Sequence, residues 1–365
     1  MKICFFGNAR NVHLCSVASR LARRGHEVRV VCHKPVAIAG VAVEQFAVPP
    51  LGLKYACRWA TRWSRYLRGF LRRFDCVVLF FLHDWGFTSE MFDDGCFVAY
   101  PQGSDVVPPP GETPPTQELI DRRVSWLRHA RAVGRISPSF AEPLARFAGL
   151  EVGHLDPLPL GVDGSRFRRK APLADRRDGA YRVGFFKGFR EVYGSTYLVR
   201  AMPTILAAQA NARFDMVGEG AQLDPCRVLV DQLGVGDAVR WIDRVPHEAV
   251  PDLLAEWTVS VVPSVCESFG VAAIESQAME VPVVASNVGG LPDAVRDGET
   301  GLLVPPESPD AIAEAVVSLL SDGPRRERMG RAGRAWVRST FDWSIVLDQW
   351  EETLFRARDR SSVMV

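Results

Sequence analysis

Two separate runs of alternating strand and helix signals constrain the fold of this chain more than any other feature of its sequence. In the first run, short apolar stretches predict strands at residues 2–7, 27–32, 76–82, 96–100 and 132–136. Stretches with the apolar spacing of helices lie between them, at residues 12–24 and 117–130. Strands separated by helices predict a parallel sheet covered on both faces.

The second run follows a segment of turn-forming residues. Residues 161–180 contain Gly161-Val162-Asp163-Gly164, a short basic run, Pro172 and Asp178-Gly179, which is typical of a linker between domains. Strands are then predicted at residues 182–186, 213–217, 238–242, 259–263, 282–286 and 301–304. Helices are predicted at residues 196–209, 223–233, 271–280, 309–320, 324–339 and from 343 onwards.

The alternation therefore predicts an α/β protein of two Rossmann-like, doubly wound domains facing each other across a cleft. We place the first domain at residues 1–165, the linker at 166–181 and the second domain at 182–342. A length of 365 residues is sufficient for two hydrophobic cores. Ligands bind beyond the carboxyl ends of the strands in such sheets, so we expect the site between the two domains.

The composition excludes several other classes of protein. Apolar residues make up 47% of the chain and charged residues 24%, which is typical of a globular protein and excludes a disordered or fibrous one. The longest unbroken apolar run, residues 76–82, is far shorter than the ~20 residues that span a bilayer. The N-terminus predicts a strand rather than a signal peptide. The eight cysteines stand singly, which indicates reduced thiols in a cytoplasmic protein and neither a disulfide framework nor a zinc site.

Charge is distributed unevenly along the chain. Residues 1–180 carry 26 Lys and Arg against 17 Asp and Glu, whereas residues 181–365 carry 18 against 26. Opposite net charges favour packing of the two halves on each other, and the basic half could also favour an anionic partner or surface. We expect no nucleic-acid partner.

The densest cluster of chemically distinctive residues follows the predicted strand at 259–263. It contains Glu267, Ser268, Phe269, Gly270, Val271 and, one helical turn later, Glu275. Gly270 allows a ligand to approach the backbone closely, and the amides of Phe269, Gly270 and Val271 would be unsatisfied donors at a helix N-terminus. Such donors form a site for an anion such as a diphosphate. Glu275 shares the helix face of these amides and would accept hydrogen bonds from hydroxyls such as those of a ribose, and Glu267 from those of a sugar.

The spacing Glu267-x7-Glu275 resembles the donor-binding motif of glycosyltransferase family 4, whose members have the two-domain GT-B fold. The resemblance extends to Pro282-Val283-Val284, Gly289-Gly290-Leu291-Pro292, Asp297-Gly298-Glu299-Thr300-Gly301, Met329-Gly330, Val217-Gly218-Glu219-Gly220 and Val245-Pro246-His247-Glu248. It covers residues 182–345 strongly. It is weaker over residues 1–165, where Gly25-His26-Glu27-Val28, Gly103-Ser104-Asp105 and Gly161-Val162-Asp163 keep the family order.

The resemblance implies a retaining transfer of a sugar from a nucleoside-diphosphate sugar, with Glu275 on the ribose hydroxyls and Glu267 on the transferred sugar. It places Gly218 and Val245 in the donor site and returns the final helix, from about residue 343, to the first domain. It implies no metal cofactor, because basic side chains and the helix N-terminus take the charge of the leaving diphosphate, and the sequence has no Asp-x-Asp. The acceptor is not identified and could be a cell-envelope glycan, a glycolipid or a secondary metabolite.

The sequence departs from the family pattern where basic residues usually bind the diphosphate. The segment after the first strand of the second domain contains Lys187 and Arg190, and Tyr193 occupies the usual Lys position. We take Lys187 and Arg190 as the candidates for the diphosphate, since at least one cation is needed at the leaving group. The alternative is that either one is a solvated surface charge.

Two departures lie in the first domain. The family often has two glycines after the first strand, and here Gly7-Asn8 stands there, so Gly7 and Asn8 remain donor-contact candidates. Gln102 replaces a common His beside Gly103-Ser104-Asp105, and it can hydrogen-bond but cannot titrate. Gln102 and Gly103 are candidates for the donor sugar. Asp105 is either a catalytic residue on the acceptor side or a residue that forms the turn.

Residues 54–73 contain seven basic and no acidic residues, with aromatic residues spaced as on one face of a helix. Such a helix could lie on an anionic membrane surface at the inner face, or it could pack its aromatic face on the first sheet. Two other functions stay open: a sugar-nucleotide epimerase of the same fold, and a degenerate subunit without catalysis. Gln102 argues against the first, and the pair of glutamates argues against the second.

Overall fold

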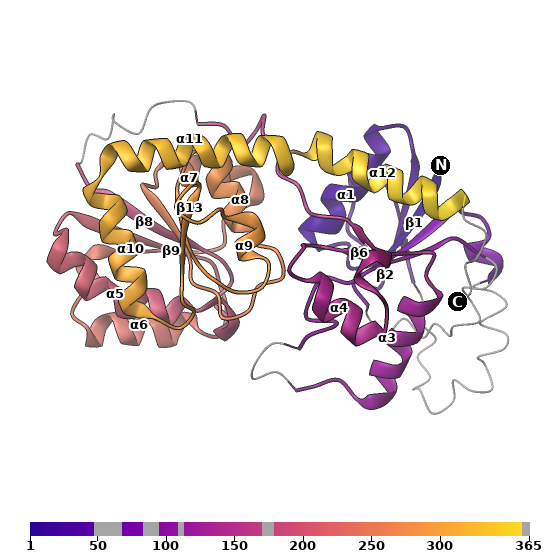
Figure 1. Ribbon diagram of the computed structural model, residues 1–365, viewed down its shortest axis with the longest axis horizontal. Coiled ribbons are helices and arrows are strands. Elements are labelled where there is room, and N and C mark those ends of the chain that lie inside the picture. Colours follow the sequence, from indigo (N-terminus) through magenta and orange to yellow (C-terminus); the bar gives the residue numbers. More distant parts are fainter. Residues whose placement is uncertain (47–67, 83–94, 109–112, 170–178, 360–365) are drawn as a thin grey trace. The chain divides into compact units, whose positions relative to one another are not determined.

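The computed structural model describes residues 1–46, 68–82, 95–108, 113–169 and 179–359 (Figure 1). Two compact units divide the chain, one formed by Met1–Pro159 and Val346–Val365 and the other by Leu160–Ile345. Each unit is a parallel sheet with helices, so the predicted α/β class with two Rossmann-like units is confirmed.

The sheet of the first unit has the strand order β3-β2-β1-β4-β5-β6-β7, with all pairs parallel. Its strands are β1 (Lys2–Phe6), β2 (Glu27–Cys32), β3 (Ala42–Gln45), β4 (Cys76–Phe80), β5 (Phe97–Tyr100), β6 (Ala132–Arg135) and β7 (Leu155–Pro157). The helices are α1 (Val12–Arg23), α3 (Gln117–His129), α4 (Ala141–Ala148) and the greater part of α12 (Trp343–Asp359), with a 3-10 turn at Val152–His154. The order reverses between β1 and β4, which is the arrangement of a doubly wound sheet.

Helix α12 is part of the first unit from Val346 onwards. The Trp350 side chain is fully buried there, 4.8 Å from the ring of Tyr100, and its Nε1 donates to the carbonyl of Pro159 at 3.3 Å. On the same helix, Asp348 and Glu351 each accept a hydrogen bond of 2.6 Å from Arg24. The buried indole and the two ion pairs with Arg24 therefore fix the helix to this unit.

The sheet of the second unit has the order β10-β9-β8-β11-β12-β13, again all parallel. Its strands are β8 (Tyr181–Phe186), β9 (Ala212–Val217), β10 (Val239–Ile242), β11 (Val259–Val262), β12 (Val283–Ser286) and β13 (Gly301–Val304). The helices are α5 (Ser195–Ala208), α6 (Leu223–Gln232), α7 (Val250–Ala255), α8 (Val271–Ala278), α9 (Leu291–Ala294), α10 (Pro309–Ser321) and α11 (Gly323–Thr340), with 3-10 turns at Glu191–Tyr193, Gly236–Ala238 and His247–Ala249.

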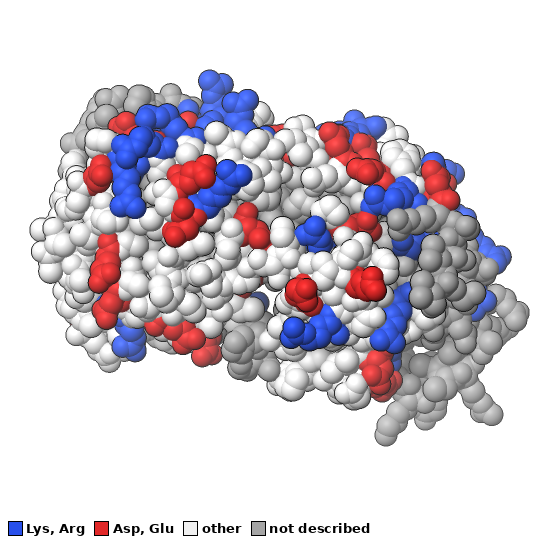
Figure 2. Space-filling view, in the orientation of Figure 1, with Lys and Arg blue, Asp and Glu red and all other residues white. Residues whose placement is uncertain are grey.

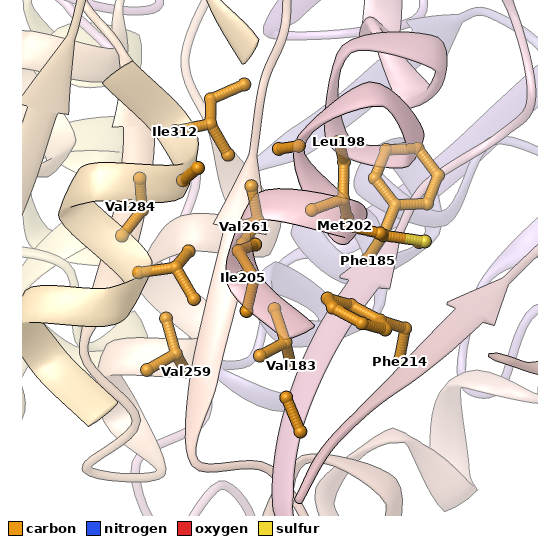
Figure 3. Close-up of a cluster of buried hydrophobic side chains, with 14 of the residues drawn as sticks. Val183, Phe185, Leu198, Met202, Ile205, Phe214, Val259, Val261, Val284 and Ile312 are labelled. Atoms are coloured by element: carbon orange, nitrogen blue, oxygen red, sulfur yellow. The ribbon is translucent and has the colours of Figure 1, made fainter. Parts of the chain in front are cut away.

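The core of the second unit lies between this sheet and its helices. Val183 and Phe185 of β8 and Val261 of β11 face Leu198 and Met202 of α5 in a hydrophobic cluster, and none of these five side chains is more than 1% exposed (Figure 3). Within the sheet, the buried Asp215 carboxylate of β9 accepts two hydrogen bonds from Arg240, 2.9 and 2.7 Å long, and one from Trp257 Nε1. This buried charge is therefore compensated, as burial in a low dielectric requires.

The predicted domain boundary is displaced in the structure. The segment expected to be the end of the first domain and a linker begins the second unit at Leu160. The reason is local pairing: Val162 donates to the carbonyl of Phe341 at 2.8 Å, and Arg169 donates to carbonyls of Met279 and Trp257. Residues 170–178 of the predicted linker lie outside the described residues.

Most predicted strands and helices are found within a few residues of their expected ends. Among the strands and α-helices of the described residues, five were not predicted: the edge strands β3 and β7 and the short helices α4, α7 and α9. Of the predicted basic aromatic helix, residues 54–67 lie outside the described residues, and the turn that ends it buries Leu71. None of the described helices combines the length and the hydropathy needed to cross a bilayer. Figure 2 shows both signs of charge on both units in the face that it presents.

Replacing Trp350 by Ala should lower the free energy of unfolding by about 3–5 kcal/mol, because removing a fully buried indole leaves a cavity among Phe80, Tyr100 and Pro159. Phe355→Ala is the matched control on the same helix, since Phe355 is 38% exposed and should cost less than about 1 kcal/mol. Guanidinium denaturation measures both values. Equal, small losses would show that α12 adds nothing to the core.

Candidate functional site

The predicted donor-site residues of the second unit lie in loops at the carboxyl ends of its strands. Lys187 follows β8 directly, Gly218 follows β9, Val245 follows β10 and Glu267 lies in the loop after β11. Because the sheet is parallel, these loops share one edge. The structure therefore brings together residues that are up to 80 positions apart in the sequence.

Lys187 and Glu267 form an ion pair at this edge. Both side chains are only 13% exposed, and the Oε2 atom of Glu267 is the partner of the ammonium group. Ser264 Oγ donates to the same oxygen at 3.4 Å, and the ring centroid of Tyr193 lies 4.2 Å from Lys187 Nζ. Burial lowers the pKa of Lys187 to about 7, and the neighbouring Cys266 opposes this shift.

Glycines bring the loops that carry this pair into backbone contact. A Cβ at Gly218, where φ is +135°, would lie 2.2 Å from the carbonyl oxygen of Lys187. A Cβ at Gly289 would lie 1.8 Å from the carbonyl oxygen of Glu267, and Gly290 N donates to that oxygen at 2.9 Å. Gly289 and Gly290 were recognised in the sequence only as part of a motif. Their contacts identify them as residues that position Glu267.

Helix α8 begins beside Glu267 with open backbone donors. Gly270 precedes it at φ +103°, and the Phe269 side chain is buried against Phe341 with ring centroids 5.4 Å apart. In the part of the chain that the structure describes, the amides of Phe269, Gly270 and Val271 donate to no protein acceptor. Together with Ser268, they form the expected end of the helix that can receive an anion.

Glu275 lies one turn into α8 with its side chain 6% exposed. His247, in the 3-10 turn after β10, lies 2.8 Å from its Oε1 through the ring nitrogen Nε2. A carboxylate accepts hydrogen bonds only, so Nε2 is the donor. His247 belongs to the motif Val245-Pro246-His247-Glu248, but nothing in the sequence indicates its contact with Glu275.

The other candidates of this unit are less closely joined to the pair. Arg190 is exposed, and its guanidinium carbon lies 5.8 Å from the ring centroid of Tyr193, farther than Lys187 Nζ does. Val245 is half-buried in the loop after β10. The structure thus favours Lys187 over Arg190 as the cation next to Glu267.

In the first unit, Gly7 and Asn8 form the turn between β1 and α1. A Cβ at Gly7 would lie 2.1 Å from a methyl carbon of Leu14, so a larger residue would push the helix away. Asn8 is exposed, and its Oδ1 accepts from Arg10 N at 3.0 Å. Asn11 caps α1 by accepting from two amides of its first turn. Gly7 and Asn8 therefore lie at the carboxyl edge of this sheet, where a ligand would be expected.

Asp105 is a structural residue in this conformation. Its carboxylate is 1% exposed and accepts hydrogen bonds from the amides of Leu82, Gln102 and Gly103 at 2.8, 2.9 and 2.9 Å. Burial raises the pKa of Asp105, and these three amides oppose that effect. Arg123 donates to the carbonyls of Asp105 and Leu82. The geometry favours the turn-forming role, because the carboxylate is buried and accepts from three backbone amides of its own turn and the neighbouring strand end.

Gln102 and Gly103 lie in this same turn after β5. Gly103 has φ +119°, and its carbonyl accepts from Val106 and Val107. The Nε2 of Gln102 is buried and has no hydrogen-bond partner among the described residues, which leaves a donor for a ligand. Within the described ranges, no three His, Cys, Asp or Glu side chains gather in a metal-binding arrangement.

Two families match this chain, one over each unit. The family described as "Glycosyl transferases group 1" matches residues 171–336, and the family described as "Glycosyltransferase Family 4" matches residues 11–166. Between them they leave out only residues 1–10, 167–170 and 337–365.

Curated relatives point to the same family. The D-inositol 3-phosphate glycosyltransferase of Thermomonospora curvata is 35% identical over 243 residues, which are 60% of this chain and 55% of that protein. The GDP-mannose-dependent alpha-(1-6)-phosphatidylinositol monomannoside mannosyltransferase of Mycobacterium tuberculosis is 34% identical over 202 residues, 52% of each chain. The chain spans about half the length of the curated relatives it matches.

Solved structures share the fold over almost the whole chain. Sucrose-phosphate synthase from Thermosynechococcus elongatus has a TM-score of 0.81 at 21% identity and covers 98% of both chains. HepE of Anabaena in complex with UDP and glucose has a TM-score of 0.77 at 18% identity, over 97% of this chain and 99% of that one. The GT-B fold is thus common to all three proteins, and the family matches over both units show that the chain belongs to glycosyltransferase family 4.

Proposed function

We propose that this chain is a retaining glycosyltransferase that moves a sugar from a nucleoside-diphosphate sugar to an acceptor without a metal cofactor. The observation that carries the proposal is the buried pair of Lys187 and Glu267 beside the open amides that begin α8. This edge offers a cation and helix donors for a diphosphate, and two carboxylates, Glu267 and Glu275, for hydroxyl groups. HepE, which has the same fold, is named as a complex with UDP and glucose, and this supports a nucleotide donor here.

The proposed donor position follows from the charges of the site. The diphosphate would accept from the amides of Phe269, Gly270 and Val271 and would draw Lys187 away from Glu267. Glu267 would then be free to accept hydrogen bonds from the transferred sugar. Preorganised donors in a site of low exposure stabilise the charge that develops on a leaving diphosphate, which supports a mechanism without a metal.

The transfer forms a bond between the acceptor oxygen and the anomeric carbon, and it breaks the bond between that carbon and the diphosphate oxygen. The acceptor's proton must go to another base. Asp105 is a poor candidate for this base because its side chain is buried and held in a turn by three backbone amides. We therefore assign the proton to the leaving diphosphate or to water.

The acceptor and the base of the donor are left open. The mycobacterial relative is named for GDP-mannose and HepE for UDP, so we propose a nucleoside diphosphate without choosing the base. The acceptor could be a cell-envelope glycan, a glycolipid or a secondary metabolite. A cytoplasmic location and a peripheral contact of residues 54–73 with anionic membrane rest on the sequence alone.

Incubation with labelled nucleotide-sugars tests the proposed class of reaction. Hydrolysis or transfer of the labelled sugar would support a glycosyltransferase. Isomerisation of the donor would instead indicate an epimerase, and the absence of any reaction with every donor would indicate a subunit without catalysis.

Substitutions of the two glutamates should affect different kinetic and binding constants. Glu275→Gln should weaken binding of the nucleoside diphosphate, because a charge-assisted hydrogen bond to hydroxyls contributes about 1.5–3 kcal/mol. Glu267→Ala should lower kcat while the affinity for the nucleoside diphosphate stays near that of the wild type. Calorimetry and steady-state kinetics measure the two effects. An equal loss of nucleotide affinity in both variants would contradict these roles.

Activity should survive EDTA, since Lys187 and the α8 amides supply the positive charge. Lys187→Ala should lower kcat/KM at least tenfold, which corresponds to about 1.4 kcal/mol of barrier. Arg190→Ala is the matched control and should have the smaller effect, because Arg190 is exposed. A strict requirement for magnesium or manganese would overturn the proposed mechanism.

Binding of the nucleoside diphosphate should take up protons at pH 8. With a pKa of about 7, free Lys187 is mostly neutral at that pH, and an adjacent diphosphate raises the pKa of an amine. The bound state therefore holds more protons than the free state, by at most one. Calorimetry in buffers of different ionisation enthalpy measures this uptake. Lys187→Arg should take up almost none, because a guanidinium is charged in both states. Proton release by the wild type would contradict the prediction.

A further inference from the structure

We infer that His247 is a positioning residue for the nucleotide, which holds the carboxylate of Glu275 in the orientation that receives the ribose hydroxyls. The inference rests on the proposed function, in which Glu275 binds the ribose. It adds a residue that no sequence pattern assigned, and it predicts an effect on nucleotide selectivity rather than on chemistry.

His247 is well placed to control Glu275. The hydrogen bond from its Nε2 to Glu275 Oε1 is 2.8 Å long, and within the described part of the chain no other side chain donates to this carboxylate. Glu275 is buried, and a buried carboxylate without a donor is unfavourable and free to change rotamer. Each carboxylate oxygen has two lone pairs, so Glu275 can accept from His247 and from hydroxyls at the same time.

His247 is itself held on two sides. Its carbonyl oxygen accepts from Arg166 Nη2, and its ring lies 5.6 Å from the ring of Phe167, which is 1% exposed. Arg166 N is fixed in turn by Asp163, whose carbonyl and Oδ1 accept from it at 3.1 and 3.2 Å. Arg334 donates to the carbonyl of Phe167 at 3.0 Å.

These contacts form a series that ends at the Glu275 carboxylate. The segment of residues 163–167 fixes His247, and His247 fixes the Glu275 carboxylate by one hydrogen bond. Since neither residue is assigned to the reacting carbon, loss of His247 should weaken nucleotide binding and leave the rate at saturating donor almost unchanged. The loss should also be greatest for nucleotides that carry both ribose hydroxyls.

The experiment measures binding of the nucleoside diphosphate that stabilises the wild type most in a thermal-shift screen, together with its 2′-deoxy form. The wild type should prefer the ribose form. His247→Ala should raise the Kd for the ribose form about tenfold and remove most of the preference, while kcat stays within about twofold. His247→Gln should restore binding, because its terminal amide can reach Glu275 as Nε2 does. His247→Asn is the matched control, since its amide is too short.

The pair should also be coupled. Adding His247→Ala to Glu275→Gln should cost less than the sum of the two single changes, because both remove the same contact. Melting without ligand checks folding, and if His247→Ala does not fold, the comparison of His247→Gln with His247→Asn carries the test.

The outcomes separate this inference from the proposed function. If no nucleoside diphosphate binds the wild type, or if Glu275→Gln binds as tightly as the wild type, the proposed role of Glu275 fails and the inference fails with it. If Glu275→Gln loses affinity while His247→Ala, or His247→Asn, keeps both affinity and ribose preference, only the inference about His247 is overturned.

Discussion

The candidate site depends on backbone contacts that only glycine permits. The loops after β8, β9 and β11 and the Gly289-Gly290 turn approach each other so closely that a single methyl group at Gly218 or Gly289 would lie about 2 Å from a carbonyl oxygen. These contacts hold the main chain of Lys187 at Gly218 and that of Glu267 at Gly289. The ion pair between their side chains is a result of that backbone arrangement, which leaves each side chain only 13% exposed.

Burial of this pair gives the site its chemical character. Burial brings the pKa of Lys187 near neutrality. The protonation of Lys187, and so the positive charge at this edge, therefore depends on the charge of the group bound there. An exposed cation such as Arg190 would keep its charge in every state and would be screened by water. The structure thus separates two residues that were both candidates from the sequence, because burial is set by loops distant from both in the sequence.

The sequence predicted the strands and helices that a local residue pattern marks. It did not predict the features that depend on contacts between residues distant in the sequence. The inner strands were found because they are apolar runs, whereas the edge strand β3 is partly exposed and β7 contains Pro157, so neither has such a run. The motif pointed to Glu267 and Glu275, whose assignment to one donor site stays a prediction, and the structure places both near the start of α8. The motif could not identify His247, whose contact is made 28 residues away, nor show that three amides occupy Asp105, since hydrogen bonds of the folded backbone leave no trace in spacing.

These contacts give a physical reason for the spacing of seven residues between the two glutamates. Glu267 ends a loop and faces the cation that follows β8, whereas Glu275 lies one turn inside α8 and faces the donor that follows β10. The open amides lie between them at the start of the helix. A shorter spacing would place both carboxylates beside the amides, where they would compete with an anion for the same donors. The spacing therefore keeps each carboxylate paired with its own partner and leaves the helix N-terminus free.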